Sequence, residues 1–218
     1  ARPPHVILPK VESTPDVDAA PRAPDAAGAP QLPLHALIES PAAVHRAFDI
    51  AAHPRIQSLS FGLMDFVSAH GGAIPEHGMG AQGQFTHPLV VPAELETARA
   101  CPGHGRVPSH CVVTEFKDRE AMRSAAHRAG AEFGFTRMWS IHPDQIRPIL
   151  EALAPTEGEI AQAADIVARA EQAAWAPISV AGKLHDRASY RFYWQVLERA
   201  HRTGSRLPTE ARRWFAGA

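Results

Sequence analysis

The segment from Leu34 to Gly72 constrains the fold most, because it holds two short apolar runs separated by a helical pattern. The first run, Leu34 to Ile38, ends at Glu39, and the second, Leu59 to Met64, ends at Asp65. Each run has the length and apolar content of a buried strand. The segment therefore predicts a strand, a helix and a second strand, with one carboxylate where each apolar run ends.

The residues between the two runs carry the signals of a helix start. Ser40 can act as N-cap and Pro41 as the first helical residue, and apolar residues then recur at helical spacing at Val44, Ala47, Phe48 and Ala51. Two buried parallel strands joined by a helix form a right-handed crossover, which places both strand ends on the same edge of the sheet. We therefore expect Glu39 and Asp65 to converge.

Two carboxylates at one edge of a parallel sheet repel each other unless a positive charge lies between them. A hard divalent cation such as Mg²⁺ meets that need, because it binds oxygen ligands and retains several waters. The alternative is that each acid is a helix cap or a solvated surface charge. From their shared strand-helix-strand frame we expect Glu39 and Asp65 to be metal ligands.

Four motifs in a fixed order resemble a known family: LPKVES at Leu8–Ser13, ALIES at Ala36–Ser40, SFGLMDF at Ser60–Phe66 and GF-x-x-x-W-x-IHP-x-Q at Gly134–Gln145. The family is the citrate lyase beta-subunit-like group of the HpcH/HpaI aldolases, and the likeness extends from Val6 to about Leu197. The resemblance implies that Glu39 and Asp65 hold a Mg²⁺ ion that binds a 2-keto acid or an acyl carboxylate.

The resemblance also implies an α/β fold, a (β/α)8 TIM barrel of which this chain carries strands four to eight. Five strands are expected, near residues 6–11, 34–39, 58–62, 109–114 and 138–141. The family's first three strands, with the arginine that pairs with the substrate carboxylate, should precede Ala1. Because Ala1 is not a start methionine, we expect the chain to be the C-terminal piece of a longer polypeptide, or its upstream residues to be unrecorded.

Two regions are expected in the chain. Residues 1–155 should form the C-terminal part of the barrel, and residues 156–218 should form a C-terminal helical arm. The arm begins with a capping box at Thr156–Glu159 and ends in a helix from Arg187 to about His201 with an aromatic stripe. Such an arm reaches across a subunit interface in the family, so the resemblance implies a homo-oligomer, a trimer or a hexamer.

Asp186 is the candidate catalytic residue. The segment GKLHD, Gly182–Asp186, resembles the family's Gly-x-Met-Ile-Asp, whose aspartate is an acid/base in a neighbouring subunit's site. The match is partial, because Leu184 and His185 replace the methionine and isoleucine. Asp186 also directly precedes a predicted helix, so it can equally be an N-cap.

The first functional hypothesis is a Mg²⁺-dependent carbon-carbon lyase that cleaves a 3-hydroxyacyl-CoA such as citryl-CoA or malyl-CoA. One alternative is a CoA-independent aldolase that releases pyruvate from a 4-hydroxy-2-keto acid, and another is a non-catalytic subunit that keeps the fold. The chain departs from the family at Arg137 and Met138, where Gly-Lys is common. Any role of that lysine is therefore in doubt here.

Composition excludes several other classes of function. The 218 residues are 45% hydrophobic with a formal charge of -1, which suits a soluble enzyme and gives no electrostatic case for nucleic acid or an anionic membrane. No apolar run approaches the roughly 18 residues of a membrane span, and the first residues lack a signal-peptide pattern. We expect a cytoplasmic protein with a small-molecule carboxylic acid or acyl-CoA as partner.

The cysteines and histidines give no metal motif. Cys101 and Cys111 are expected to stay reduced, as is usual inside the cell. None of the 13 histidines falls in a Cys-x-x-Cys or His-x-x-x-His pattern, so we expect them mostly on the surface or in loops.

A five-stranded parallel sheet has two open edges, and this gives the first testable prediction. Unpaired backbone groups at sheet edges promote association with other chains. We expect residues 1–218, expressed alone, to aggregate or to form an unstable oligomer in size-exclusion chromatography. A soluble monomer that melts cooperatively would contradict the missing-strand interpretation.

Overall fold

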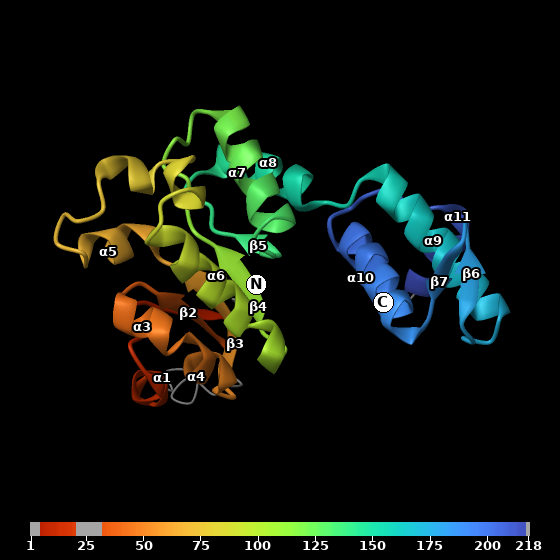
Figure 1. Ribbon diagram of the computed structural model, residues 1–218, viewed down its shortest axis with the longest axis horizontal. Coiled ribbons are helices and arrows are strands. Elements are labelled where there is room, and N and C mark those ends of the chain that lie inside the picture. Colours follow the sequence, from red (N-terminus) through yellow and green to blue (C-terminus); the bar gives the residue numbers. More distant parts are fainter. Residues whose placement is uncertain (1–4, 21–31, 217–218) are drawn as a thin grey trace. The chain divides into compact units, whose positions relative to one another are not determined.

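Residues 5–20 and 32–216 are described by a computed structural model, in which the chain divides into two units on either side of the Leu153–Ala154 bond (Figure 1). This boundary lies close to the one expected between barrel and arm. The roles assigned to the two regions remain predictions.

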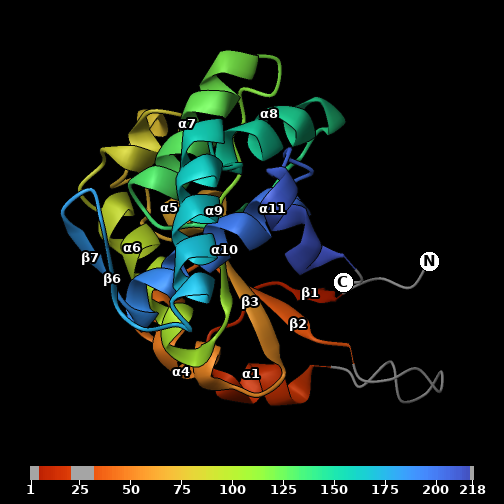
Figure 2. The ribbon, with the colours of Figure 1, turned by 90° about the vertical axis from the view of Figure 1, so that its right-hand side faces the viewer.

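The described part of the first unit is built on a parallel five-stranded sheet whose strand order follows the sequence. The strands are β1 (Val6–Leu8), β2 (Leu34–Ile38), β3 (Ile56–Phe61), β4 (Val107–His110) and β5 (Arg137–Met138). Every neighbouring pair is parallel, and β1 to β3 lie side by side in Figure 2. All five expected strands are therefore present, joined by helical crossovers.

The crossovers and loops of the first unit carry both α-helices and short 3-10 helices. They are α1 (Thr14–Ala19), α3 (Pro41–His45), α4 (Ala47–Ala52), α5 (Leu63–Ser68), η1 (Glu76–Met79), η2 (Gly83–Phe85), α6 (Val90–Ala100), η3 (Pro102–His104), α7 (Arg119–Ala131) and α8 (Pro143–Leu153).

The sheet has one face packed on helices and one that carries polar residues. On β2, Leu34, Ala36 and Ile38 join a buried cluster with residues of α1 and α4. Because side chains alternate along a strand, His35 and Glu39 point to the opposite face. The sheet therefore presents Glu39 at the carboxyl end of the polar face.

His35 is buried on the polar face, and its surroundings give a pH-dependent prediction. Its Nδ1 lies 2.6 Å from Ser58 Oγ. Burial, aided by the positive charges of His5 and Arg137, lowers the pKa of His35 from 6.5 to about 4. The folded state therefore favours the neutral ring. The contribution of His35 to the free energy of unfolding is fully present above pH 6.5 and is lost as the pH falls through 4.

Replacing His35 with Gln should therefore flatten the acid side of the stability profile. Between pH 6.5 and 4 the unmodified chain should lose up to about 3 kcal/mol more unfolding free energy than His35→Gln, since each pKa unit corresponds to about 1.4 kcal/mol. Urea denaturation at pH 7, 5 and 4 measures the difference. Parallel stability profiles of the two proteins would show that His35 stays accessible to protons in the folded state.

Several expected boundaries were wrong. The predicted helix after Ser40 breaks at Arg46, whose backbone leaves helical geometry, into α3 and α4. The buried face is formed by Ala43, Ala47 and Ile50, and Phe48, which the helical pattern grouped with the apolar residues, is 39% exposed. Strands β4 and β5 end sooner than expected, because their paired registers cover only a few residues.

The second unit contains α9 (Glu157–Gln172), β6 (Ile178–Val180), β7 (Lys183–His185), α10 (Arg187–Arg202), α11 (Thr209–Arg212) and η4 (Arg213–Phe215). The capping box at Thr156 and Glu159 that starts α9 is confirmed.

The β6–β7 hairpin was not predicted. Its two turn residues, Ala181 and Gly182, both have positive φ, as a tight two-residue hairpin turn requires, but Ala-Gly lacks the usual Asn-Gly signal.

Both cysteines are free thiols, buried in the first unit, as expected. Among the described residues, every helix is too short or too polar to cross a bilayer.

Candidate functional site

Glu39 directly follows β2 and is only 9% exposed. Its Oε2 accepts a 2.8 Å hydrogen bond from the backbone N–H of Lys10, which follows β1. Burial raises the pKa of Glu39 above its usual value, and the negative charges of Asp65 and Glu12 add to the rise against the opposing effect of Lys10. A cation that binds Glu39 therefore relieves an electrostatic cost already present in the fold.

Asp65 lies in the first turn of α5. The sequence had suggested a position at the end of a strand. Strand β3 stops at Phe61, and Leu63 and Met64, the last residues of the second apolar run, belong to the helix. The expected convergence nevertheless occurs, since Lys10 contacts Glu39 through its backbone N–H and Asp65 through its Nζ. The helix begins immediately after the strand, so its first turn stays at the carboxyl edge of the sheet.

Gly62 makes this arrangement possible. Its N–H donates a 2.8 Å hydrogen bond to the carbonyl of Ile38, which closes the end of β3 onto β2. A Cβ atom at residue 62 would lie 2.3 Å from Cγ and 2.9 Å from Oε1 of Glu39. Only glycine leaves room for the Glu39 side chain in its present position.

Gly62→Ala should therefore weaken divalent-cation binding without changing any charge. The added methyl group must displace the Glu39 side chain from its Cγ outwards. Overpacking of this kind costs about 1–3 kcal/mol of stability. We expect Mg²⁺ affinity to fall roughly ten-fold or more in isothermal titration calorimetry, since about 1.4 kcal/mol is a factor of ten. Gly103→Ala is the matched control, because a Cβ there meets no atom within 4 Å. Equal affinities in both variants would show that the position of Glu39 does not matter.

Lys10 contacts both acids. Its Nζ lies 3.3 Å from Asp65 Oδ1, and the two side chains are 74% and 51% exposed. Its backbone has a φ of 54°, a left-handed conformation that aims the N–H at Glu39. Because exposed ion pairs contribute little to stability, a divalent cation can displace the ammonium group from Asp65.

The segment after Lys10 is tied to the next crossover. The Ser40 hydroxyl donates a 2.7 Å hydrogen bond to Glu12 Oε2, and Ser40 Oγ accepts one from the N–H of Ala43 as the N-cap of α3. These bonds position the loop that carries Lys10. Two carboxylates fixed in this way, with oxygen donors only, fit a hard cation such as Mg²⁺ that takes its other ligands from water or substrate.

Asp186 lies in the second unit and caps α10. Its Oδ1 accepts hydrogen bonds from the N–H groups of Ala188, at 3.0 Å, and Ser189, at 3.3 Å. The capping interpretation is therefore confirmed. A catalytic role for Asp186 stays a prediction, and it is compatible with the cap.

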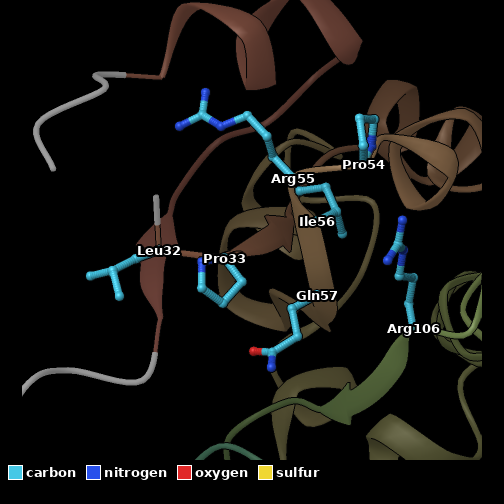
Figure 3. Close-up of a pocket in the computed structure, with 7 residues that line it drawn as sticks. All are labelled: Leu32, Pro33, Pro54, Arg55, Ile56, Gln57 and Arg106. Atoms are coloured by element: carbon cyan, nitrogen blue, oxygen red, sulfur yellow. The ribbon is translucent and has the colours of Figure 1, made fainter. Parts of the chain in front are cut away.

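A cavity of about 420 Å³ lies at the other end of the strands (Figure 3). Pro33 and Arg55 on its lining precede β2 and β3, so it is remote from the edge that carries Glu39. Arg55 donates to the carbonyls of Val17 and Ala20, and the lining residue Arg106 donates to two further backbone carbonyls. These guanidinium groups bind carbonyls at the C-terminal ends of α1 and α4, and this cavity is not the candidate site.

The sequence and the fold were compared with known proteins. No family model matches the sequence. The L-malyl-CoA/beta-methylmalyl-CoA lyase of Rhodobacter capsulatus is 31% identical over 183 residues, which are 78% of this chain and 57% of that protein. The chain thus spans little more than half the length of this curated relative.

Two solved structures share the fold. A citrate lyase from Burkholderia xenovorans LB400 is 48% identical, with a TM-score of 0.83 over 96% of this chain and 67% of that one. Protein CitE of Mycobacterium tuberculosis, solved in complex with magnesium and acetoacetate, is 25% identical, with a TM-score of 0.58 over 70% of this chain and 58% of that one.

Proposed function

Because the chain belongs to the citrate lyase beta-like group of the HpcH/HpaI family, we propose that its first unit is part of a Mg²⁺-dependent carbon-carbon lyase. The substrate class is a 3-hydroxyacyl-CoA such as malyl-CoA or citryl-CoA. The observation that carries the proposal is the pair of carboxylates, Glu39 and Asp65, brought together at the carboxyl edge of a parallel sheet.

The topology supports a place for this unit within a TIM barrel. Five parallel strands follow one another in sequence order, and a helix or loop crosses between each pair, as in an alternating β/α barrel. In such barrels the active site lies at the carboxyl ends of the strands. Glu39 and the first turn of α5 occupy that edge here.

The proposed chemistry assigns separate tasks to the chain's residues. Glu39 and Asp65 would hold the Mg²⁺ ion, which supplies stabilisation of the negative charge that develops on a substrate oxygen during cleavage. Lys10, released from Asp65, would keep an ammonium group beside the bound anion. Asp186 of a second subunit would transfer the proton. Both of its capping bonds use Oδ1, so they leave Oδ2 for this role.

The second unit is proposed as an arm in a homo-oligomer, a trimer or a hexamer. Large apolar side chains on it are exposed in the single chain, at Trp175, Leu184 and Phe192. Covering these side chains with another subunit would remove apolar surface from water, which favours association. Sedimentation velocity would detect the assembly, and a strictly monomeric active enzyme would contradict it.

The functional test compares substrates with and without metal. Malyl-CoA, citryl-CoA and a free 4-hydroxy-2-keto acid are each incubated with the protein in Mg²⁺ or in EDTA. We expect cleavage of a CoA ester that requires Mg²⁺. Cleavage of the free acid alone would point to a CoA-independent aldolase, and no cleavage by a folded, metal-binding oligomer would point to a non-catalytic subunit.

A further inference from the structure

A second group of polar side chains lies in the buried core of the first unit. Glu94 on α6, His110 on β4, Cys111 just after β4 and Gln84 on η2 are each no more than 1% exposed. One donor atom from each of Glu94, His110 and Cys111 lies within 4.8 Å of the other two. The sequence spacing of these residues matches no zinc motif, and histidines were expected mostly on the surface or in loops.

The His110 ring is held firmly in place. It stacks on Phe85 with 5.1 Å between ring centroids and meets the edge of Phe135 at 4.9 Å. Its Nε2 lies 3.3 Å from Glu94 Oε2. A buried carboxylate needs a positive partner, because an isolated charge is costly inside a protein. Within the described residues, the side chains that contact Glu94 are His110 and Cys111, and neither carries a permanent positive charge.

The cluster has more hydrogen-bond acceptors than hydrogens. The Cys111 sulfur lies 3.4 Å from Gln84 Oε1, 3.6 Å from Glu94 Oε1 and 3.8 Å from His110 Nδ1. In the tautomer whose Nε2–H donates to Glu94, Nδ1 is also an acceptor. One thiol hydrogen then faces three acceptors, and the Gln84 amide group is already turned towards the carbonyl of Gly80.

The separations also suit a tetrahedral metal ion. Zinc bonds of about 2.0–2.2 Å to nitrogen or oxygen and about 2.3 Å to sulfur place neighbouring donors roughly 3.3–3.7 Å apart. Measured from the Cys111 sulfur, Gln84 Oε1 at 3.4 Å and Glu94 Oε1 at 3.6 Å fall in that range, and His110 Nδ1 at 3.8 Å lies just beyond it. A mixed set of nitrogen, sulfur and oxygen favours zinc over magnesium, which prefers oxygen alone.

We propose that Glu94, His110 and Cys111, with Gln84 as a fourth oxygen donor, form a structural binding site for a zinc-class divalent cation. Binding replaces the Cys111 S–H bond with a sulfur–metal bond and releases the proton to solvent. The thiolate and the Glu94 carboxylate together balance the two positive charges of the ion. Because all four side chains are buried, the ion enters during folding and exchanges slowly afterwards.

Cobalt(II) is the probe that tests this site, because thiolate coordination gives Co²⁺ a near-ultraviolet charge-transfer band. The intact protein is refolded with Co²⁺, passed through a desalting column and measured by absorption and by elemental analysis. We expect one tightly held Co²⁺ per chain with the thiolate band, and competition by Zn²⁺. Far-UV circular dichroism confirms folding in each preparation.

Cys111→Ser should lose the band, and Cys101→Ser should keep it. The second variant is a matched control, because Cys101 is also buried and its thiol donates a hydrogen bond to the carbonyl of Thr97. Asp65→Asn should keep the band too, so failure of the proposed lyase site does not affect the result. Folded protein without a thiolate band, or a band that persists in Cys111→Ser, would overturn the proposal.

Discussion

Asp65→Asn is expected to reduce Mg²⁺-dependent cleavage by roughly 10³-fold or more. The substitution keeps the size of the side chain and removes one of two carboxylates that would hold the ion. A bound metal supplies several kcal/mol of transition-state stabilisation, and each 1.4 kcal/mol corresponds to a factor of ten in rate. Glu39→Gln should have an effect of similar size, and steady-state kinetics with a CoA-ester substrate measures both.

The controls separate loss of the metal from loss of the fold. Asp49→Asn removes an exposed carboxylate from α4 and should leave the rate unchanged. Because burial raises the pKa of Glu39, a neutral Gln should be accommodated at least as well, so Glu39→Gln should melt no lower than the unmodified chain in EDTA. Full activity in both Asp65→Asn and Glu39→Gln would remove the basis for the proposed metal site.

Asp186→Asn should lower turnover by about 10²- to 10⁴-fold, the usual contribution of a general acid/base. The same change should cost only a few tenths of a kcal/mol in stability, since Asn and Asp are similarly good N-caps. Kinetics and melting temperature are measured on the same oligomeric preparation.

Asp118→Asn is the matched control for Asp186→Asn. Asp118 caps α7 with Oδ1 bonds of 3.1 and 2.9 Å to two backbone N–H groups, the same capping geometry as at Asp186. If both variants keep near-normal turnover, Asp186 is a cap and no more. If only Asp186→Asn loses turnover, with an unchanged melting temperature, the acid/base role is supported.

The strand-helix-strand frame was predictable because its signals are local. The apolar run of β2, the Ser40 cap and Pro41 at the first helical position each depend on neighbouring residues, and all three are observed. The convergence of Glu39 and Asp65 followed from the handedness of parallel crossovers, a rule that needs no contact information.

The errors arose where tertiary contacts outweigh local patterns. The apolar run from Leu59 to Met64 spans the end of a strand and the start of a helix, and hydrophobicity alone does not show where the backbone turns. Phe48 fits the helical period, but the face that packs on the core is that of Ala47 and Ile50, and the break at Arg46 was not predicted. That arginine donates to the carbonyl of Glu12, a contact 34 residues distant that no local pattern shows.

Parts of the site were also beyond sequence reasoning. Gly62 could have been suspected, since a glycine between a strand and an acidic helix start often marks close packing, but its contact with Glu39 is visible only in space. The buried cluster around Cys111 combines residues from positions 84 to 111 with no regular spacing. Metal motifs are recognised by spacing, so a site assembled by the fold alone escapes detection.

The most direct test of the central claim, that Glu39 and Asp65 hold a divalent cation, is a crystal structure of the protein soaked with Mn²⁺. Manganese suits the same carboxylate ligands as magnesium and scatters anomalously. We predict an anomalous peak bound by carboxylate oxygens of Glu39 and Asp65, with the Lys10 ammonium displaced from its 3.3 Å contact with Asp65. No peak at these oxygens at saturating Mn²⁺, with Lys10 still paired to Asp65, would contradict the account.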